Sequence, residues 1–233
     1  MLSEPLQVET TASNVSLGGT VDKALKAFRA GKPVLVHDFD DREGEIDLVY
    51  PALAVSPDDV ATMRNNAGGL VCVAVSHEVA EAFGLPFLAD ELSHPTARNK
   101  DLDYDERSSF SLPVNHVDTF TGITDIDRAR TITALGRAAA DPESVDFSAE
   151  FRSPGHVHIL RGAPGLLSTR QGHTELGITL ARAAGRAPAA VVCEMLDEGT
   201  GRALSKMDAR QYARRHSIPY VEGQTVKESL ATG

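Results

Sequence analysis

Residues 33–50 read PVLVHDFDDREGEIDLVY, and this stretch says more about the fold than any other in the 233-residue chain. Two short apolar runs, at 33–37 and 46–50, indicate strands because they are rich in Val, Leu and Ile. The segment between them, 38–45, is a dense acidic loop with a single arginine. We therefore expect two neighbouring strands that are joined by an acidic loop.

Strands and helices alternate along the rest of the chain. Apolar runs predict further strands at 70–75, 110–114, 156–160, 189–194 and 218–221. Helical spacing with capping or terminating residues predicts helices at 20–31, 56–66, 76–84, 127–140, 173–185 and 207–216. This interleaving predicts an α+β fold, with a mixed β-sheet flanked by helices. A single compact domain is expected from residue 20 to residue 233, after a flexible N-terminal tail at 1–19.

The composition restricts the kinds of partner. The formal net charge is −10, which disfavours broad binding to nucleic acid or to an anionic membrane surface. No apolar run reaches the roughly 20 residues of a membrane span, and no signal peptide is visible. The two cysteines, Cys72 and Cys193, each lie in an apolar run and are expected to be buried and reduced. Together these features predict a cytoplasmic protein.

The acidic loop is the first candidate site. Its carboxylates crowd into residues 38–47, at Asp38, Asp40, Asp41, Glu43, Glu45 and Asp47. Such a density of like charge is costly unless a cation lies among the side chains, either a divalent metal or Arg42. A solvated acidic turn is the alternative, although the position of the loop between two strands favours a site.

Residues 170–175, RQGHTE, form the second candidate site. Gly172 allows close backbone approach, and His173 and Thr174 begin a predicted helix, where free N–H groups favour an anion. Arg170 adds a side chain that can bind a phosphate through two N–H groups. The pattern indicates a pocket for one phosphate group, whereas an ordinary helix cap with a surface histidine is the alternative.

Two further positions could carry proton transfer. His156 follows a predicted turn at 153–155 and precedes His158 by two residues, so both imidazoles should lie on one face of a strand. Either one could instead be a satisfied structural histidine. Glu194 ends the apolar run 189–194, where a carboxylate needs a partner, and a functional role or a structural ion pair would explain it equally well.

Taken together, these stretches resemble the 3,4-dihydroxy-2-butanone 4-phosphate synthases of riboflavin biosynthesis, over about 21–221 of the chain. The family pattern Asp-Arg-Glu-x-Glu-x-Asp stands here as residues 41–47, and Arg-Pro-Gly-His stands as 152–156 with one inserted serine. Arg-Gly-Gly-His-Thr-Glu stands as 170–175 with one glycine replaced, and Cys-Glu stands as 193–194. Four motifs in the family's order make the resemblance specific, and it implies a monofunctional member.

The resemblance implies a reaction and a set of residues for it. D-ribulose 5-phosphate would be converted to L-3,4-dihydroxybutan-2-one 4-phosphate and formate, with Mg²⁺ or Mn²⁺ as the cofactor. The implied metal ligands are Glu43 and His173, and the implied catalytic residues are His156, Glu194 and Glu43. The implied substrate-binding residues are Arg42, Glu43, Asp47, Thr121, Arg170, Gln171, Gly172, His173, Thr174 and Glu194. The family is usually homodimeric with active sites at the subunit interface, so a homodimer is expected.

Other functions could use the same residues. A metal-dependent aldolase or isomerase acting on another sugar phosphate would need the same carboxylate, histidine and phosphate cradle. A non-catalytic sensor of phosphorylated metabolites would not need the proton-transfer groups, and an acidic interaction protein would leave the carboxylates in solvent. Residues 88–109 are polar and lack a strong pattern, which suggests the hypothesis of a lid over the substrate.

Overall fold

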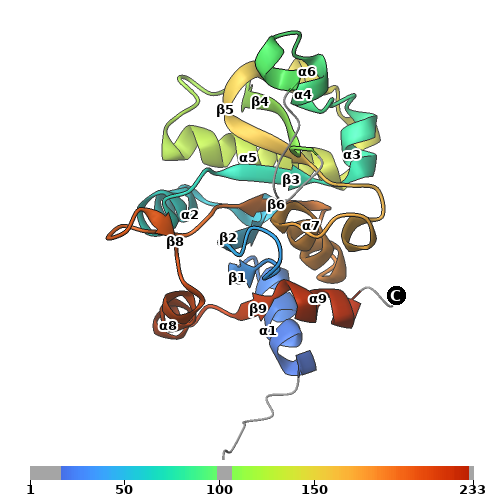
Figure 1. Ribbon diagram of the computed structural model, residues 1–233. Helices are drawn as coiled ribbons and strands as arrows, with labels where there is room; N and C mark the ends of the chain where they lie inside the picture. The colour runs from blue at the N-terminus through green and yellow to red at the C-terminus, as the bar shows by residue number, and fades with distance from the viewer. Residues whose placement is uncertain (1–16, 99–106, 231–233) are drawn as a thin grey trace, which may run out of the picture.

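A seven-stranded mixed sheet forms the centre of the computed structural model, which describes residues 17–98 and 107–230 (Figure 1). Its strands are β1 (Val34–His37), β2 (Ile46–Pro51), β3 (Cys72–Val75), β4 (Phe110–His116), β5 (Phe151–Arg161), β6 (Ala189–Val192) and β9 (Tyr220–Glu222). They lie in the order β4-β5-β3-β6-β2-β1-β9. The pairs β1–β9 and β3–β5 are parallel, and the other neighbouring pairs are antiparallel. The predicted α+β fold with a mixed sheet in one compact domain is confirmed.

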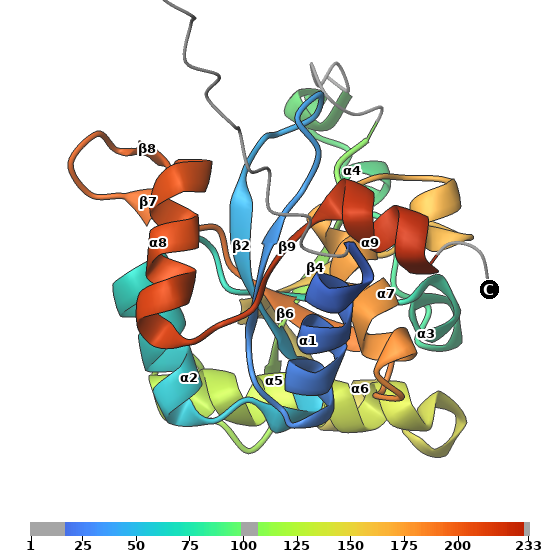
Figure 2. The ribbon, with the colours of Figure 1, turned by 90° about the horizontal axis from the view of Figure 1, so that it is seen from below.

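Helices cover both faces of this sheet (Figure 2). They are α1 (Leu17–Arg29), α2 (Pro57–Thr62), α3 (His77–Ala82), α4 (Leu88–Glu91), α5 (Asp125–Ala140), α6 (Phe147–Glu150), α7 (His173–Ala183), α8 (Lys206–His216) and α9 (Gly223–Leu230). Single turns of 3₁₀- or π-helix lie at Ala52–Ala54, Met63–Ala67, Pro95–Arg98, Pro142–Ser144 and Leu166–Ser168. β7 (Leu196–Asp197) and β8 (Arg202–Ala203) form a separate hairpin. Among the described residues, no helix has the length and apolar character that crossing a membrane requires.

Two apolar cores follow from this arrangement. One lies between the sheet and helices α2 and α5, and it includes Met63 and Ile132. The other lies between the sheet and helices α1, α7 and α9, and it includes Phe28, Leu176 and Val226. The central strands β1, β2, β3 and β6 are buried throughout, as expected for strands that are covered on both faces.

Two boundaries predicted from the sequence differ from those in the structure. Helix α1 begins at Leu17, so Thr20 lies inside the helix instead of capping it, and the predicted boundary after residue 19 falls within α1. The rest of the predicted tail, residues 1–16, lies outside the described residues. Residues 88–98 contain α4 and a 3₁₀ turn where no pattern was seen, and 99–106 of the predicted lid also lie outside the described residues.

The predicted turn at 153–155 is wrong. Strand β5 runs through these residues, but Val114 pairs with Val157 and the next residue, Asn115, pairs with Arg152, so residues 153–156 form an irregular bulge between them. Gly155 makes this possible because a Cβ there would lie only 1.9 Å from the carbonyl carbon of Val114. The backbone of β5 therefore passes close over β4 instead of turning away from it.

Candidate active site

Asp38 folds the acidic loop between β1 and β2. Its side chain is buried, and its two carboxylate oxygens accept the backbone N–H groups of Glu43 at 3.2 Å and Glu45 at 3.0 Å. Gly44, with a φ of 67°, supplies the left-handed conformation at the tip of the loop. The loop is therefore an ordered turn closed around a buried carboxylate. Sequence reasoning gave Asp38 no role of its own, although its place directly after a buried strand was a signal.

The loop brings Glu43 against the first residue of α7. Glu43 Oε2 lies 3.6 Å from His173 Nδ1, and Asp47 Oδ1 lies 3.5 Å from His173 Nε2. Asp38, Glu43 and His173 each offer one ligand atom, and these atoms lie within 4.8 Å of one another. His173 Nε2 and Asp47 Oδ1 are buried and have no hydrogen-bond partner in the described part of the chain. Two carboxylates, an imidazole and these orphaned atoms fit a divalent cation.

The charges of this cluster are strongly coupled. Burial opposes ionisation of Glu43, but the hydrogen bond with His173 and the charge of Arg42 outweigh it and lower the pKa of Glu43. Burial raises the pKa of Asp47 to about 8, against the influence of His173. Burial would lower the pKa of His173, but the charges of Asp47 and Glu43 raise it to about 9. The cluster therefore retains a proton near neutral pH, and a metal ion would compete with that proton.

The second motif forms an anion cradle at the start of α7. Gly172 is the N-cap and has no side chain to cap the helix, so a bound anion could accept hydrogen bonds from N–H groups of the first turn. Arg170 is held beside this end because its Nη1 lies 2.7 Å from Glu175 Oε2. Glu175 is completely buried, and its other oxygen accepts the N–H of Ala163 at 3.0 Å. Sequence reasoning missed this orienting role of Glu175, although a carboxylate in the first turn of a buried helix was a signal.

Glu194 enters the same site from the end of β6. Its Oε2 accepts the backbone N–H of Leu70 at 2.8 Å, and its backbone bridges to Asp47. Gly69 is required for this approach, because a Cβ there would lie 2.4 Å from Glu194 Oε2 and 2.5 Å from the carbonyl oxygen of Glu194. The carboxylate is thus fixed in direction by the neighbouring chain segment, a feature that the sequence did not reveal.

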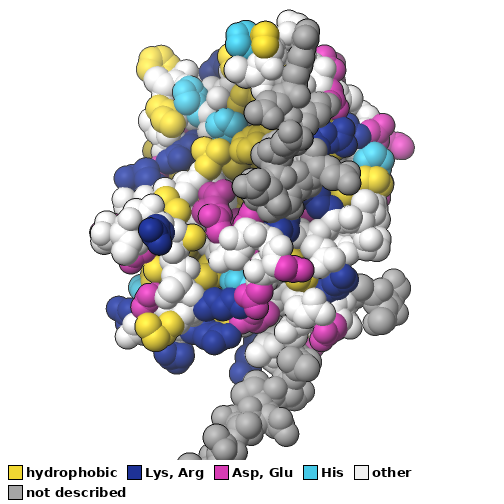
Figure 3. Space-filling model, in the orientation of Figure 1, with side chains coloured by type: hydrophobic (Ala, Val, Ile, Leu, Met, Phe, Trp, Pro, Cys, Tyr) yellow, Lys and Arg dark blue, Asp and Glu magenta, His cyan; other side chains and the backbone are white. Residues whose placement is uncertain are grey.

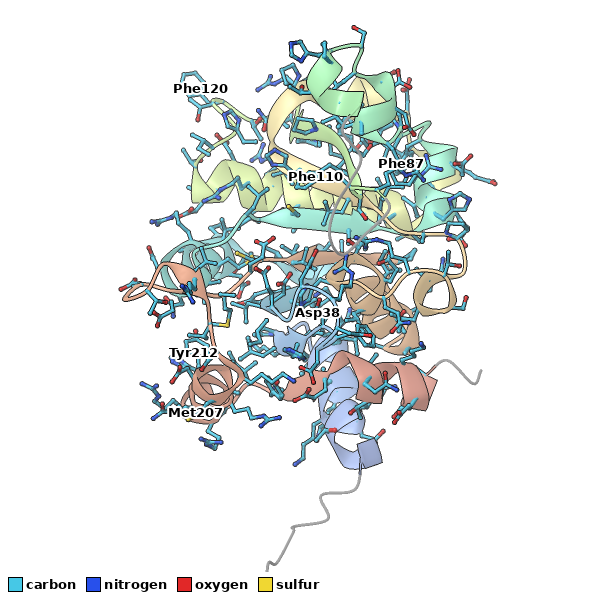
Figure 4. All side chains as sticks on the ribbon, in the orientation of Figure 1. Asp38, Phe87, Phe110, Phe120, Met207 and Tyr212 are labelled. Atoms are coloured by element: carbon cyan, nitrogen blue, oxygen red, sulfur yellow. The ribbon has the colours of Figure 1, made fainter. Side chains whose placement is uncertain are left out.

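These groups meet in a cavity of about 160 Å³. Its lining includes Arg42, Glu43, Asp47, Cys72, Phe110, Arg170, His173, Thr174 and Glu194. An adjoining cavity of about 760 Å³ shares Arg42 and Arg170 and adds Gln171 to its lining. Asp38 lies near the middle of the molecule in Figure 4, and acidic side chains gather in the same part of the surface in Figure 3.

His156 and Thr121 are not brought into this cavity. His156 lies on β5 at the bulge, where its Nδ1 is 3.1 Å from Asn115 Nδ2. Thr121 lies in the loop before α5, with its hydroxyl 3.5 Å from Asp127. Figure 4 shows Phe120, the neighbour of Thr121, far from Asp38. Within one chain, the residues predicted for the site therefore fall into two separate groups.

The fold and the cavity together define a class of protein. A carboxylate and imidazole cluster suited to a divalent cation lies beside an uncapped helix N-terminus with an oriented arginine. Enzymes that act on small phosphorylated substrates with the help of a metal ion combine these two elements. The described part of the chain contains both elements, side by side.

Comparison with known proteins gives the family. Residues 22–229 match the family model for 3,4-dihydroxy-2-butanone 4-phosphate synthase, and the chain belongs to this family. The 3,4-dihydroxy-2-butanone 4-phosphate synthase of Archaeoglobus fulgidus is 50% identical over 219 residues, which cover 89% of this chain and 92% of that protein. The Methanosarcina mazei synthase is 48% identical over 222 residues, which cover 90% of each chain. The family and function predicted from the four motifs are confirmed.

Solved structures of the same family share the fold. The Candida albicans synthase is similar with a TM-score of 0.74 at 31% identity, over 90% of this chain and 96% of that chain. A synthase structure in complex with two magnesium ions is similar with a TM-score of 0.74 at 29% identity, over 90% of this chain and 95% of that chain.

Proposed function

We propose that this chain is a lyase that converts D-ribulose 5-phosphate to L-3,4-dihydroxybutan-2-one 4-phosphate and formate, and so supplies the four-carbon unit of riboflavin. The observation that carries the proposal is the single cavity shared by Glu43, His173, Arg170 and Glu194. A metal cluster and a phosphate cradle within one cavity match a sugar phosphate that is held at both ends. Membership of the synthase family supports the same reaction.

Glu43 and His173 would hold the divalent cation. One carboxylate and one imidazole leave the remaining coordination positions to water and substrate oxygens, which suits Mg²⁺, and Mn²⁺ accepts the same ligands. A cation bound there would stabilise the negative charge that develops on neighbouring substrate oxygens during enolisation. The solved relative in complex with two magnesium ions supports magnesium as the first choice.

The chain's own residues would position the substrate around that cation. The phosphate would lie at the N-terminus of α7, against Arg170, Gly172 and Thr174, with Gln171 at the mouth of the cavity. Arg42 and Asp47 would orient the hydroxyl groups nearer the metal. Glu194 engages Leu70 through Oε2, so its second oxygen is available to exchange a proton with the substrate.

A homodimer would supply His156 and Thr121, the two predicted site residues that do not reach the cavity of their own chain. The segment 117–126 exposes large apolar side chains, including Phe120 at 94% and Ile126 at 65% exposure, which is typical of a surface that contacts protein. Phe120 projects outward from this segment in Figure 4. Thr121 and His156 belong to the same end of the molecule, so a second copy that docks there would receive both residues beside its own cavity.

We further propose that the dimer is cytoplasmic, where Cys72 and Cys193 would remain reduced thiols.

Formate release tests the proposal. Purified protein with Mg²⁺ should convert ribulose 5-phosphate to equal amounts of formate and the four-carbon phosphate, and the Glu194→Gln variant should not. An aldolase or isomerase would yield other sugar phosphates without formate, and a sensor would bind ribulose 5-phosphate in calorimetry without turnover. Absence of formate from the folded, metal-loaded protein would reject the proposed reaction.

A further inference from the structure

The side chain of Asn115 holds His156 through both ends of its amide group. Oδ1 accepts the backbone N–H of His156 at 2.9 Å, and Nδ2 lies 3.1 Å from Nδ1 of the His156 imidazole. Both contacts cross from β4 to β5 at the bulge, where the register of the two strands shifts. One residue therefore controls both the backbone and the ring of His156.

These two contacts determine which nitrogen of the neutral imidazole carries the proton. A backbone N–H can only donate, so the amide atom that faces it must be the oxygen of Asn115. The amide nitrogen then faces Nδ1 of His156, and this nitrogen has only hydrogens to offer. Nδ1 must accept that hydrogen bond, and the ring proton must lie on Nε2.

The surroundings prevent Asn115 from adopting another orientation. Its side chain is buried, and Gly122 packs against it so closely that a Cβ on Gly122 would lie 2.1 Å from Nδ2. A Cβ on Gly155 would lie 2.3 Å from the backbone nitrogen of Asn115. The loop that carries Thr121 thus packs against the side-chain amide of Asn115, and the strand that carries His156 packs against its backbone, so both contacts limit the movement of this residue.

We infer that Asn115 is a positioning residue that makes His156 a hydrogen-bond donor through Nε2–H. The inference rests on the proposed function, in which His156 faces a substrate. A neutral imidazole that is protonated at Nε2 cannot accept a proton at that atom, but it can polarise a carbonyl or stabilise an enolate oxygen. The base that starts enolisation is then a carboxylate, and Glu194 is in position for it because Glu43 would hold the cation. This changes the role expected of His156, from proton carrier to electrophile.

The tautomer is measured directly by ¹⁵N NMR of the wild-type protein labelled at histidine. Two-bond ¹H–¹⁵N spectra distinguish protonated from unprotonated ring nitrogens, and the His156→Gln variant identifies the His156 signals by their loss. In spectra of the neutral imidazole, we expect Nε2 to be protonated and Nδ1 unprotonated. A protonated Nδ1 would overturn the inference whether or not the protein is active. If no formate is released but Nε2 is protonated, the proposed function fails and the tautomer assignment remains.

The Asn115→Asp variant tests the consequence for turnover. A carboxylate keeps an acceptor for the backbone N–H but presents a second acceptor to Nδ1, which moves the ring proton from Nε2 to Nδ1. We expect kcat for formate release to fall by roughly 10²-fold, with KM changed less than about threefold. The exposed Asn65→Asp variant, with the same change of charge, should retain wild-type kcat. A folded Asn115→Asp protein with wild-type kcat would contradict the inference. If that variant does not fold, the ¹⁵N spectrum of the wild-type protein alone tests whether Nε2 carries the proton.

Discussion

Two regions of the molecule contribute to the proposed site in different ways. The metal-side region, residues 38–47 with Glu194 and the start of α7, encloses its own cavity and is ordered by buried carboxylates. The histidine-side region, residues 115–122 with 152–158, is equally ordered around Asn115 but ends in a solvent-exposed apolar surface. In the proposed function, the first region binds the metal and the phosphate within one chain. In the proposed dimer, the second region contributes to a site only where it is covered by the partner chain.

The largest expected effect comes from the metal-side region. Glu43→Gln removes one negative charge from the cluster around His173, so we expect kcat for formate release to fall by at least about 10³-fold. The side chain of Glu43 is partly exposed, so the melting temperature should stay close to that of the wild type. Asp40→Asn, in the same loop but outside the lining of both cavities, is the matched control and should change kcat by less than about threefold. Retention of a tenth of wild-type activity by Glu43→Gln would show that the metal-side region does not bind the metal as proposed.

A smaller effect is expected where a glycine lets Glu194 approach. Gly69→Ala places a Cβ 2.4 Å from Glu194 Oε2, so we expect the free energy of unfolding to drop by about 1–3 kcal/mol and kcat to fall as the carboxylate shifts. In Gly199→Ala the nearest atom is 3.5 Å away, and the expected change is within about 0.5 kcal/mol. Urea denaturation measures both variants. Equal stability of the two would mean that Gly69 is not needed to fix Glu194.

The smallest expected effect is on the pH dependence of the free energy of unfolding, through His158 in the histidine-side region. Burial, with a smaller contribution from the charge of His156, lowers the pKa of His158 in the folded protein. Below the ordinary histidine pKa the unfolded chain then binds more protons than the folded chain, so the free energy of unfolding decreases as the pH falls. In His158→Gln this contribution is absent, and the decrease between about pH 7 and pH 5 should be shallower than in the wild type. Parallel stability curves for the two proteins would contradict this account of His158.

The same two regions differ in how much of them the sequence predicts. The metal-side residues are contiguous in two short motifs, 41–47 and 170–175, and a loop between neighbouring strands brings the first motif to the second. Asn115 was missed because its role depends on His156, 41 positions away, and nothing local distinguishes it from another strand residue. Gly69 was missed for the same reason. The absence of a side chain at Gly69 matters because Glu194 packs against it, and Glu194 lies 125 positions further along the chain at the end of β6.

The bulge shows a second limit of sequence reasoning. Ser153-Pro154-Gly155 has the composition of a turn, and local chemistry alone favours one. Whether the chain turns or continues as a bulged strand depends on the neighbour available for pairing, which here is β4. Helix α1 likewise begins at Leu17, before the cap predicted at Thr20, and it includes Gly18 and Gly19 in spite of their low helix propensity.

The central claim is that the two regions meet across a dimer, and subunit complementation tests it most directly. Glu194→Gln and His156→Gln are each expected to be inactive alone. If the two variants are unfolded and refolded together in equal amounts, half of the dimers should be mixed, and each mixed dimer should contain one site with both native residues. We expect the mixture to recover about a quarter of wild-type formate release. No recovery from a mixture shown by mass spectrometry to contain mixed dimers would mean that Glu194 and His156 act within one chain, and would contradict the account.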